Sequence, residues 1–382
     1  MVALSRTMRW VGWGFGESLI PIFIFSFAGS FAEAGLLRSV FEVTLLFCLP
    51  LAGVLADRVS ARALIIAGLV VYPLVGVSYF LAGVTGMGVY IVLARFSNAI
   101  GWGLESTGVD TYYRRMASPG RVASAFGFID TLAQGGWVIA ALIGVALLDV
   151  VPLHYLLLLI APTSLGALYI AWRAPKDPLQ APRRGPSLAS SYAVMLREWR
   201  SWGGDLRLLG ALVFFMGLIE ALMWFFIPID AYLEGANLGM VVLLTVVASM
   251  SPMFGYALGR FADFANKRTL VIAGLLFIAV VMVVLALFPG YVVKLAASFV
   301  LGLILELFVV VQKSLVTTLG PAATYGERGG AFASIGDLGD IAAPLLLGVM
   351  LDALGFSIAA ILIAWAAIAL SASFTALRFG PR

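Results

Sequence analysis

Four glutamates lie inside long apolar stretches of the sequence, where a charged side chain is expensive. They are Glu17, Glu105, Glu220 and Glu306, and Arg95 shares the stretch of Glu105. A carboxylate in hydrocarbon costs at least about 2.5 kcal/mol, so each one needs a partner, water or a proton. Because burial raises the pKa of a carboxyl group, such a group can exchange a proton near neutral pH. The pattern predicts proton exchange or solute binding; the alternative is a static pair that fixes helix packing.

A second set of charges occurs at two related places in the chain. Residues 53–68 read GVLADRVSARALIIAG and residues 259–274 read GRFADFANKRTLVIAG, with half of the positions identical at a constant offset of 206. Glu17 and Glu220, and Glu105 and Glu306, keep nearly the same offset. The sequence therefore predicts two related structural repeats of six helices each.

The composition requires a membrane environment for these elements. Of the 382 residues 62% are hydrophobic and 12% charged, with a mean hydropathy of +1.05, whereas soluble domains are about 45–50% apolar and about 25% charged. Runs such as LIIAGLVVYPLVGVSYFLAG do not alternate, which excludes strands of a membrane barrel. We therefore expect an all-α integral membrane protein.

Breaks at charged, glycine or proline clusters divide the chain into twelve expected transmembrane helices. They are placed at 8–30, 36–56, 62–83, 87–112, 122–148, 151–173, 206–231, 238–258, 269–289, 291–313, 329–351 and 354–378. The first is expected to be a retained span rather than a cleaved signal. The proline-rich segment RAPKDPLQAPRRGPS then separates an N-terminal six-helix bundle, 1–173, from a C-terminal one, 205–382. The linker, 174–204, is expected to carry an amphipathic helix.

The basic residues predict the orientation of these spans. If the N-terminus is cytoplasmic, nearly all arginines and lysines, Arg6 and Arg9 among them, fall at the inner face, with only Arg38 and Lys294 towards the outer face. We therefore expect both termini in the cytoplasm. The excess of arginine over lysine and the scarcity of Asn and Gln are typical of a prokaryote. We therefore expect the protein in the inner cell membrane. We also expect it to be a monomer.

Single cysteine and histidine residues limit the remaining chemistry. With Cys48 and His154 alone of their types, the chain has no internal disulfide and no Cys/His metal cluster. We expect no cofactor and no bound metal. The pI of about 9.2 reflects basic residues in short loops between spans, which favours helix orientation over nucleic-acid binding.

One loop motif resembles the signature of a known family. Gly53-x-Leu55-Ala56-Asp57-Arg58-x-Ser60-x-Arg62 is similar to the signature of the major facilitator superfamily, with serine at a usual glycine position. Arg95-x-x-Asn98-Ala99-x-Gly101 resembles a second motif of that family. The resemblance implies two pseudo-symmetric six-helix bundles and secondary transport by alternating access, with spans one, four, seven and ten lining a central cavity. The fifth span lacks the Gly-Pro pattern of many drug antiporters, which argues against efflux.

The positions of charged and aromatic residues in this arrangement predict roles for them. Glu17 and Glu105, with Arg95 tuning their pKa, are predicted to couple protons to transport. The residues expected to contact a small-molecule substrate are Glu220, Glu306, Trp13, Trp102, Trp224 and Asn98. The residues expected to open and close the inner side are Asp57, Arg58, Arg62, Asp263, Arg268, Asp130, Asp337 and Asp340. The alternatives are orientation of the spans for the arginines and helix packing for the tryptophans.

Other classes of membrane protein fit the sequence less well. A primary pump needs a nucleotide-binding loop of the GxxxxGK[ST] kind, which is missing from the sequence. GDLGD at 336–340 does not have the spacing of an intramembrane aspartyl protease, so we expect no enzyme. Symport, antiport, uncoupled facilitation and a non-transporting receptor on the same fold all stay open, although the buried acids favour coupling.

Overall fold

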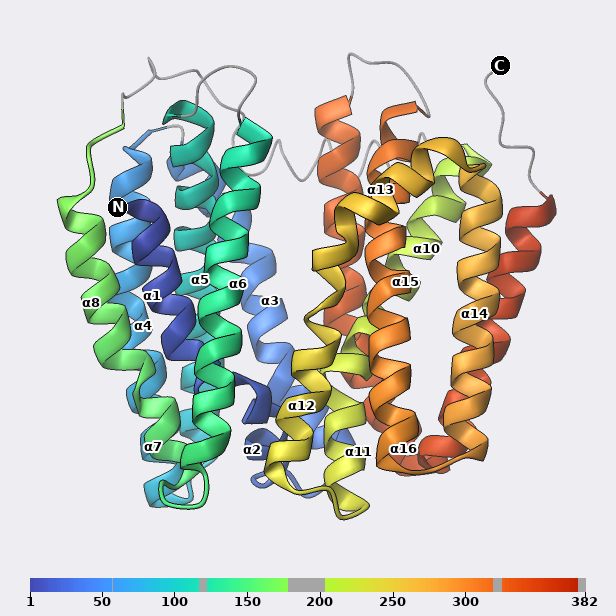
Figure 1. Ribbon diagram of the computed structural model, residues 1–382, viewed down its shortest axis with the longest axis horizontal. Helices are drawn as coiled ribbons and strands as arrows, with labels where there is room; N and C mark the ends of the chain where they lie inside the picture. The colour runs from blue at the N-terminus through green and yellow to red at the C-terminus, as the bar shows by residue number, and fades with distance from the viewer. Residues whose placement is uncertain (57, 117–121, 178–202, 319–324, 377–382) are drawn as a thin grey trace. The chain divides into compact units, whose positions relative to one another are not determined.

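The structure is a computed structural model that describes residues 1–56, 58–116, 122–177, 203–318 and 325–376. Every element in these ranges is a helix. The chain forms two compact units (Figure 1). The first comprises residues 1–27 and 40–190 and the second residues 28–39 and 191–382.

The first unit is built around the packing of α4 against α5 and α8, and of α1 against α6 and α8. Ser60 caps α4 by accepting a hydrogen bond from the Ala63 N–H at 3.2 Å, and Gly86, in the left-handed region at φ 71°, ends it. The elements of this unit are α1 (Val2–Gly14), η1 (Glu17–Leu19), α2 (Ile20–Phe25), α3 (Phe31–Ala56), α4 (Ala61–Thr85), α5 (Val89–Met116), α6 (Val122–Leu147), α7 (Leu153–Leu158) and α8 (Ile160–Arg173).

The second unit packs α10 and α14 against α16. Gly355, at φ 76° and ψ 166°, turns the chain inside α16 and so separates two helical parts. The elements are α10 (Gly204–Ala221), the π-helical η2 (Leu222–Phe226), α11 (Ile227–Leu233), α12 (Leu238–Ala248), η3 (Ser251–Phe254), α13 (Gly255–Phe264), α14 (Lys267–Leu287), α15 (Tyr291–Thr318) and α16 (Tyr325–Ala376).

The beginning of α3 belongs to the second unit. The backbone N–H groups of Phe31 and Ala32 each donate to the carboxylate of Asp352 at 2.8 Å. This carboxylate satisfies two of the donors that the first turn of a helix leaves unpaired. Residues 28–39 therefore group with α16, while the rest of α3 groups with the first unit.

The helical membrane fold agrees with the sequence analysis. Eight helices of the described residues are long and apolar enough to cross a membrane, or nine if α12, η3 and α13 form one bent span. The interrupted first span, the charged α5 and the second part of α16 complete the twelve expected crossings. The first span starts at Val2 rather than at residue 8 and is interrupted after Gly14. The predicted linker, 174–204, lies mainly outside the described residues.

Candidate functional site

A buried ion pair joins the first and fourth membrane helices of the first unit. Arg9 on α1 places Nη2 3.3 Å from Oε2 of Glu105 on α5, and their side chains are only 3% and 1% exposed. Removing two charges from water is costly, and only their attraction to each other at short distance offsets this cost. Gly68 on α4 permits the close approach of α5, because a Cβ there would lie 2.7 Å from the Glu105 backbone nitrogen.

Three aromatic rings enclose the Arg9 guanidinium. Its Cζ lies 5.3 Å from the ring centroid of Trp10, 5.0 Å from that of Tyr72 and 5.3 Å from that of Trp102. The faces of these rings carry partial negative charge and attract the cation. Arg9 is therefore held in the unit by both a carboxylate and the rings.

Glu17 lies between two arginines at the interruption of the first span. Its Oε2 accepts a hydrogen bond from Trp137 Nε1 on α6 at 2.6 Å. Arg9 and Arg95 both attract the Glu17 carboxylate electrostatically. Arg95 is 8% exposed, and its Cζ lies 4.7 Å from the Phe41 ring centroid.

Arg9, Glu17, Arg95 and Glu105 therefore form a four-charge cluster inside the first unit. Two acids and two arginines balance each other, so the cluster is neutral while both acids are ionised. Loss of the charge on either acid would leave the positive charges of the two arginines in excess.

The sequence analysis found three of the four charges. It placed Glu17, Glu105 and Arg95 in one function, and the structure brings them together. It assigned Arg9 to the inner face, whereas Arg9 is buried at 2% exposure. The predicted first span, 8–30, already included Arg9, which was the available signal, but the sequence does not say which helix faces this side chain.

The predicted substrate residues have different surroundings. Trp13 is 3% exposed and meets the Tyr72 ring edge-on, at 6.1 Å between centroids. Trp102 is half-buried and meets Trp10, which sequence reasoning missed, at 6.2 Å. Asn98 is 7% exposed on α5.

The remaining substrate candidates lie in the second unit. Glu220 is exposed near the end of α10, and Trp224 is half-buried in η2, which follows α10 directly. Short π-helical segments occur often at functional sites. Glu306 on α15 is half-buried, and a Cβ at Gly255 would lie 2.8 Å from its Oε1.

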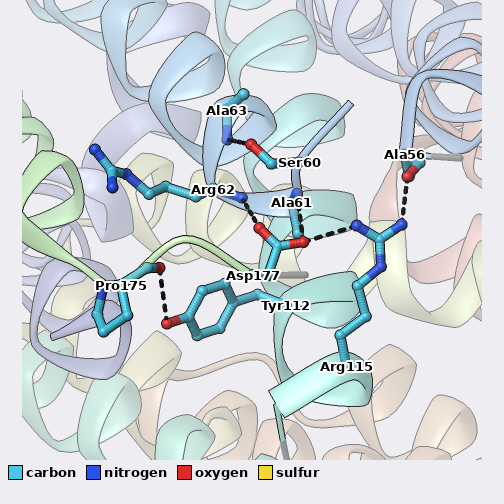
Figure 2. Close-up of polar contacts among 9 residues, drawn as sticks. All are labelled: Ala56, Ser60, Ala61, Arg62, Ala63, Tyr112, Arg115, Pro175 and Asp177. Atoms are coloured by element: carbon cyan, nitrogen blue, oxygen red, sulfur yellow. Dashed lines mark hydrogen bonds and ion pairs between the residues drawn. The ribbon is translucent and has the colours of Figure 1, made fainter. Parts of the chain in front are cut away.

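A second polar centre lies where α4 begins, around Asp177 (Figure 2). The Asp177 carboxylate accepts hydrogen bonds from the backbone N–H groups of Ala61 at 3.0 Å and Arg62 at 3.1 Å. Arg115 at the end of α5 donates to it at 2.7 Å and to the Ala56 carbonyl at 2.6 Å. Asp177, which sequence analysis did not single out, therefore connects the start of α4 to the end of α5, and Arg115 extends this connection to the end of α3.

The charge state of Asp177 follows from these contacts. Burial alone would raise the pKa of its carboxyl group. The hydrogen bonds from the Ala61 N–H and the Arg115 guanidinium outweigh burial and lower that pKa below its usual value. Asp177 is therefore ionised at neutral pH and stabilises the start of α4 as an anion.

Two predicted gating arginines bond within their own units. Arg62 Nη1 donates to the Ala174 carbonyl at 2.8 Å, just after the end of α8. Arg268 Nε donates to the Phe374 carbonyl at 2.8 Å, and its Nη2 donates to the Thr375 carbonyl, both near the end of α16. Arginines at helix C-termini bind carbonyl groups that the helix leaves without donors.

The other predicted gating residues are placed as follows. Arg6 on α1 and Asp130 on α6 form an ion pair at 3.3 Å. Arg58 and Asp263 are exposed, and Asp57 lies outside the described residues. Asp337 and Asp340 lie on α16, where a Cβ at Gly217 of α10 would be 2.9 Å from Asp340 Oδ1.

A third charged group lies in the second unit. Lys294 on α15 is 1% exposed, and its Nζ lies 2.6 Å from Asp230 Oδ2 of α11 and in contact with Glu234 Oε2. The Phe356 ring centroid is 5.6 Å from the same Nζ. Sequence analysis placed Lys294 only by its side of the membrane and gave it no partner.

Comparisons with known proteins agree with this architecture. The sequence matches the family model of the Major Facilitator Superfamily over residues 2–344. It is 19% identical over 370 residues, 92% of each chain, to the quinolone resistance protein NorA of Staphylococcus aureus (strain MRSA252).

Solved structures share the fold. A crystal structure of the D323A mutant of the nucleoside transporter NupG superposes with a TM-score of 0.81 at 15% identity, covering 98% of both chains. A D-xylose-proton symporter gives 0.72 at 15% identity, covering 96% of both. Together with the helices and the loop motif, the family match identifies a multi-pass membrane transporter, not an enzyme, and this chain belongs to the Major Facilitator Superfamily.

Proposed function

We propose that this secondary transporter moves a small solute by alternating access and couples the movement to protons through Glu17. The four-charge cluster is the observation that carries the proposal. Glu105 is 1% exposed and paired with Arg9 at 3.3 Å. Glu17 is half-buried. It is attracted by both Arg9 and Arg95, and Arg9 is also paired with Glu105.

Protonation of Glu17 would alter the forces on two helices at once. As an anion Glu17 offsets the charge of Arg9 and Arg95. Once protonated, it can still accept the Trp137 hydrogen bond, but it no longer compensates either arginine. The balance between two helix arrangements then shifts, which is what coupling requires.

The remaining roles belong to the same proposal. Solute contacts are assigned to Trp102, Trp13 and Asn98 in the first unit and to Glu220, Trp224 and Glu306 in the second. Gating of the inner side is assigned to Asp57, Arg58, Arg62, Asp130, Asp263, Arg268, Asp337 and Asp340. Trp102 is half-buried, so part of its side chain is accessible, which supports contact with the solute.

The proposed location is the inner cell membrane of a prokaryote, with a monomer whose two termini are cytoplasmic. The distribution of basic residues supports this orientation, because Lys and Arg accumulate in cytoplasmic loops.

The test begins with a solute, found by the rise in melting temperature of the purified protein across a ligand set. Proteoliposomes loaded with that solute then report two activities, uptake driven by a pH gradient and exchange at equal pH. Glu17→Gln should abolish the driven uptake and leave exchange intact.

Glu33→Gln is the matched control for this substitution. Glu33 also accepts an N–H hydrogen bond at 2.6 Å, from Gly29, but lies exposed outside the cluster. It should leave both activities unchanged. Driven uptake by Glu17→Gln at the native rate would disprove proton coupling through this residue and favour an uncoupled facilitator. A protein that binds a solute but gives no flux would be a receptor.

A further inference from the structure

The hydrogen bond on Glu17 comes from a buried tryptophan of another membrane helix. Trp137 on α6 is 4% exposed, and its Nε1 lies 2.6 Å from Glu17 Oε2. An indole nitrogen has one hydrogen to donate and accepts none, so the carboxyl oxygen must be the acceptor. The two residues are 120 positions apart in the chain. This bond therefore connects the interruption of the first span to α6.

Glycines hold the indole in place by bringing α1 and α6 close together. A Cβ at Gly14 would overlap the backbone carbonyl oxygen of Trp137, and a Cβ at Gly144 would overlap that of Phe15. A Cβ at Gly136 would lie 3.0 Å from two side chains of α1. Small residues allow membrane helices to pack backbone against backbone. The position of the indole is therefore set by the packing of the two helices and does not depend on the hydrogen bond alone.

The other polar groups around Glu17 come from three helices. Arg9 on α1 and Arg95 on α5 attract its carboxylate. Tyr72 and Tyr79 on α4, both fully buried, also interact electrostatically with Glu17. Trp137 differs from these neighbours because it is uncharged, does not titrate and donates a hydrogen bond to the carboxyl group itself.

Such a donor distinguishes the two protonation states of Glu17. A carboxylate accepts a stronger hydrogen bond than a protonated carboxyl group does. A hydrogen bond to the charged form therefore favours that form over the protonated one. Because Arg9 is also paired with Glu105, its attraction is divided between two acids. The single hydrogen of the Trp137 indole is donated to Glu17.

We propose that Trp137 is a positioning residue that sets the pH at which Glu17 binds and releases its proton. The proton binds to the Glu17 carboxylate, and the indole keeps its own hydrogen throughout. For its bearing on transport this inference rests on the proposed coupling through Glu17. It gives a part in coupling to α6, the fifth predicted span, in which the sequence analysis selected only Asp130.

The test follows the protonation of Glu17 in the purified full-length protein, without any solute. Infrared absorption of protonated carboxyl groups is recorded as a function of pH, and the band of Glu17 is the part that is missing in Glu17→Gln. Trp137→Phe keeps an aromatic ring but removes the donor. Its Glu17 band should therefore have a midpoint about one pH unit higher than in the native protein, which is about tenfold tighter proton binding.

Two comparisons separate this role from general packing. Trp172→Phe is the control, because Trp172 on α8 is 62% exposed in the same unit. It should leave the midpoint unchanged. A purely structural role of Trp137 would lower the melting temperature of Trp137→Phe without moving the midpoint of the Glu17 band.

A second measurement does not depend on how well Trp137→Phe folds. The native protein is labelled with nitrogen-15, and the indole N–H signals of its nine tryptophans are followed by NMR as the pH changes. One signal should move with the midpoint of the Glu17 band, and it should stop moving in Glu17→Gln.

The inference and the proposed function can fail separately. A native or lower midpoint in Trp137→Phe would overturn the inference, and so would the lack of an indole signal that follows Glu17. Neither result bears on whether Glu17→Gln abolishes pH-driven uptake. Driven uptake that persists in Glu17→Gln would contradict the coupling and leave the titration result standing. A Glu17 carboxyl group that never changes its protonation over the stable pH range would contradict both.

Discussion

Arg62 and Arg268, which are 206 positions apart, donate to carbonyls at the end of the last helix of their own units. Arg62 binds the Ala174 carbonyl and Arg268 binds those of Phe374 and Thr375. The residues before the two arginines also correspond, since Ser60 and Asn266 cap α4 and α14. In each unit the motif arginine therefore connects the start of one helix to the end of the last helix. This structural role is separate from the proposed role in gating.

Arg268→Ala should lower the stability of the second unit by about 1 kcal/mol, because two helix-end carbonyls lose a charged donor but regain water. Thermal unfolding of the purified protein measures the change. Arg58→Ala removes an exposed arginine from the equivalent loop of the first unit and should leave the melting temperature unchanged. Equal effects of the two substitutions would contradict the capping role.

Arg9→Leu and Glu105→Leu should each cost about 3–5 kcal/mol, because either change leaves one buried charge uncompensated. The double variant should cost less than the sum of the two single variants, because it removes both buried charges together. A double-mutant cycle on unfolding free energies tests this coupling. Additive losses would mean that the two side chains do not compensate each other.

Asp177→Asn should lower the melting temperature at neutral pH by about 2 °C or more, because the variant keeps the shape but loses the negative charge at the start of α4. The pKa of Asp177 is lowered in the folded protein. Its contribution is therefore present above the unfolded pKa of about 3.9 and is lost as the pH falls through the lower folded pKa.

The pH dependence supplies the decisive comparison for Asp177. The difference in melting temperature between the native protein and Asp177→Asn should be constant from neutral pH down to about pH 5 and shrink below about pH 4. A difference that persists unchanged at acid pH would show that Asp177 acts through packing and not through its charge.

Substitutions around Lys294 should destabilise the protein more when the substituted side chain is more deeply buried. Lys294→Met leaves two carboxylates facing each other and should cost about 3 kcal/mol or more. Asp230, whose side chain is 14% exposed, should matter more than Glu234, at 38%, so Asp230→Asn should destabilise more than Glu234→Gln. The latter should cost at most about 1 kcal/mol. Unfolding temperatures give the order, and the reverse order would contradict this account.

The predicted fold followed from properties that are local in the sequence. Hydrophobic runs, their breaks and the repeated loop motif gave the helices and the family. Glu17, Glu105 and Arg95 could be chosen because a charge in an apolar run stands out without knowledge of its neighbours. The first span was predicted to start at residue 8, whereas α1 starts at Val2. The reason is again local, since Arg9 resembled the loop charge that commonly precedes a span.

The sequence by itself thus determined the membrane setting, the helical class and the two related halves, because each depends on composition or on short-range pattern. Tertiary structure alone decided that Arg9 is the partner of Glu105, that Asp177 and Arg115 connect three helix ends and that Glu306 lies against Gly255 at the start of α13. These contacts join residues far apart in the chain, and they depend on which faces of the helices pack together and how closely. The hydropathy of the sequence does not specify which helix faces pack together.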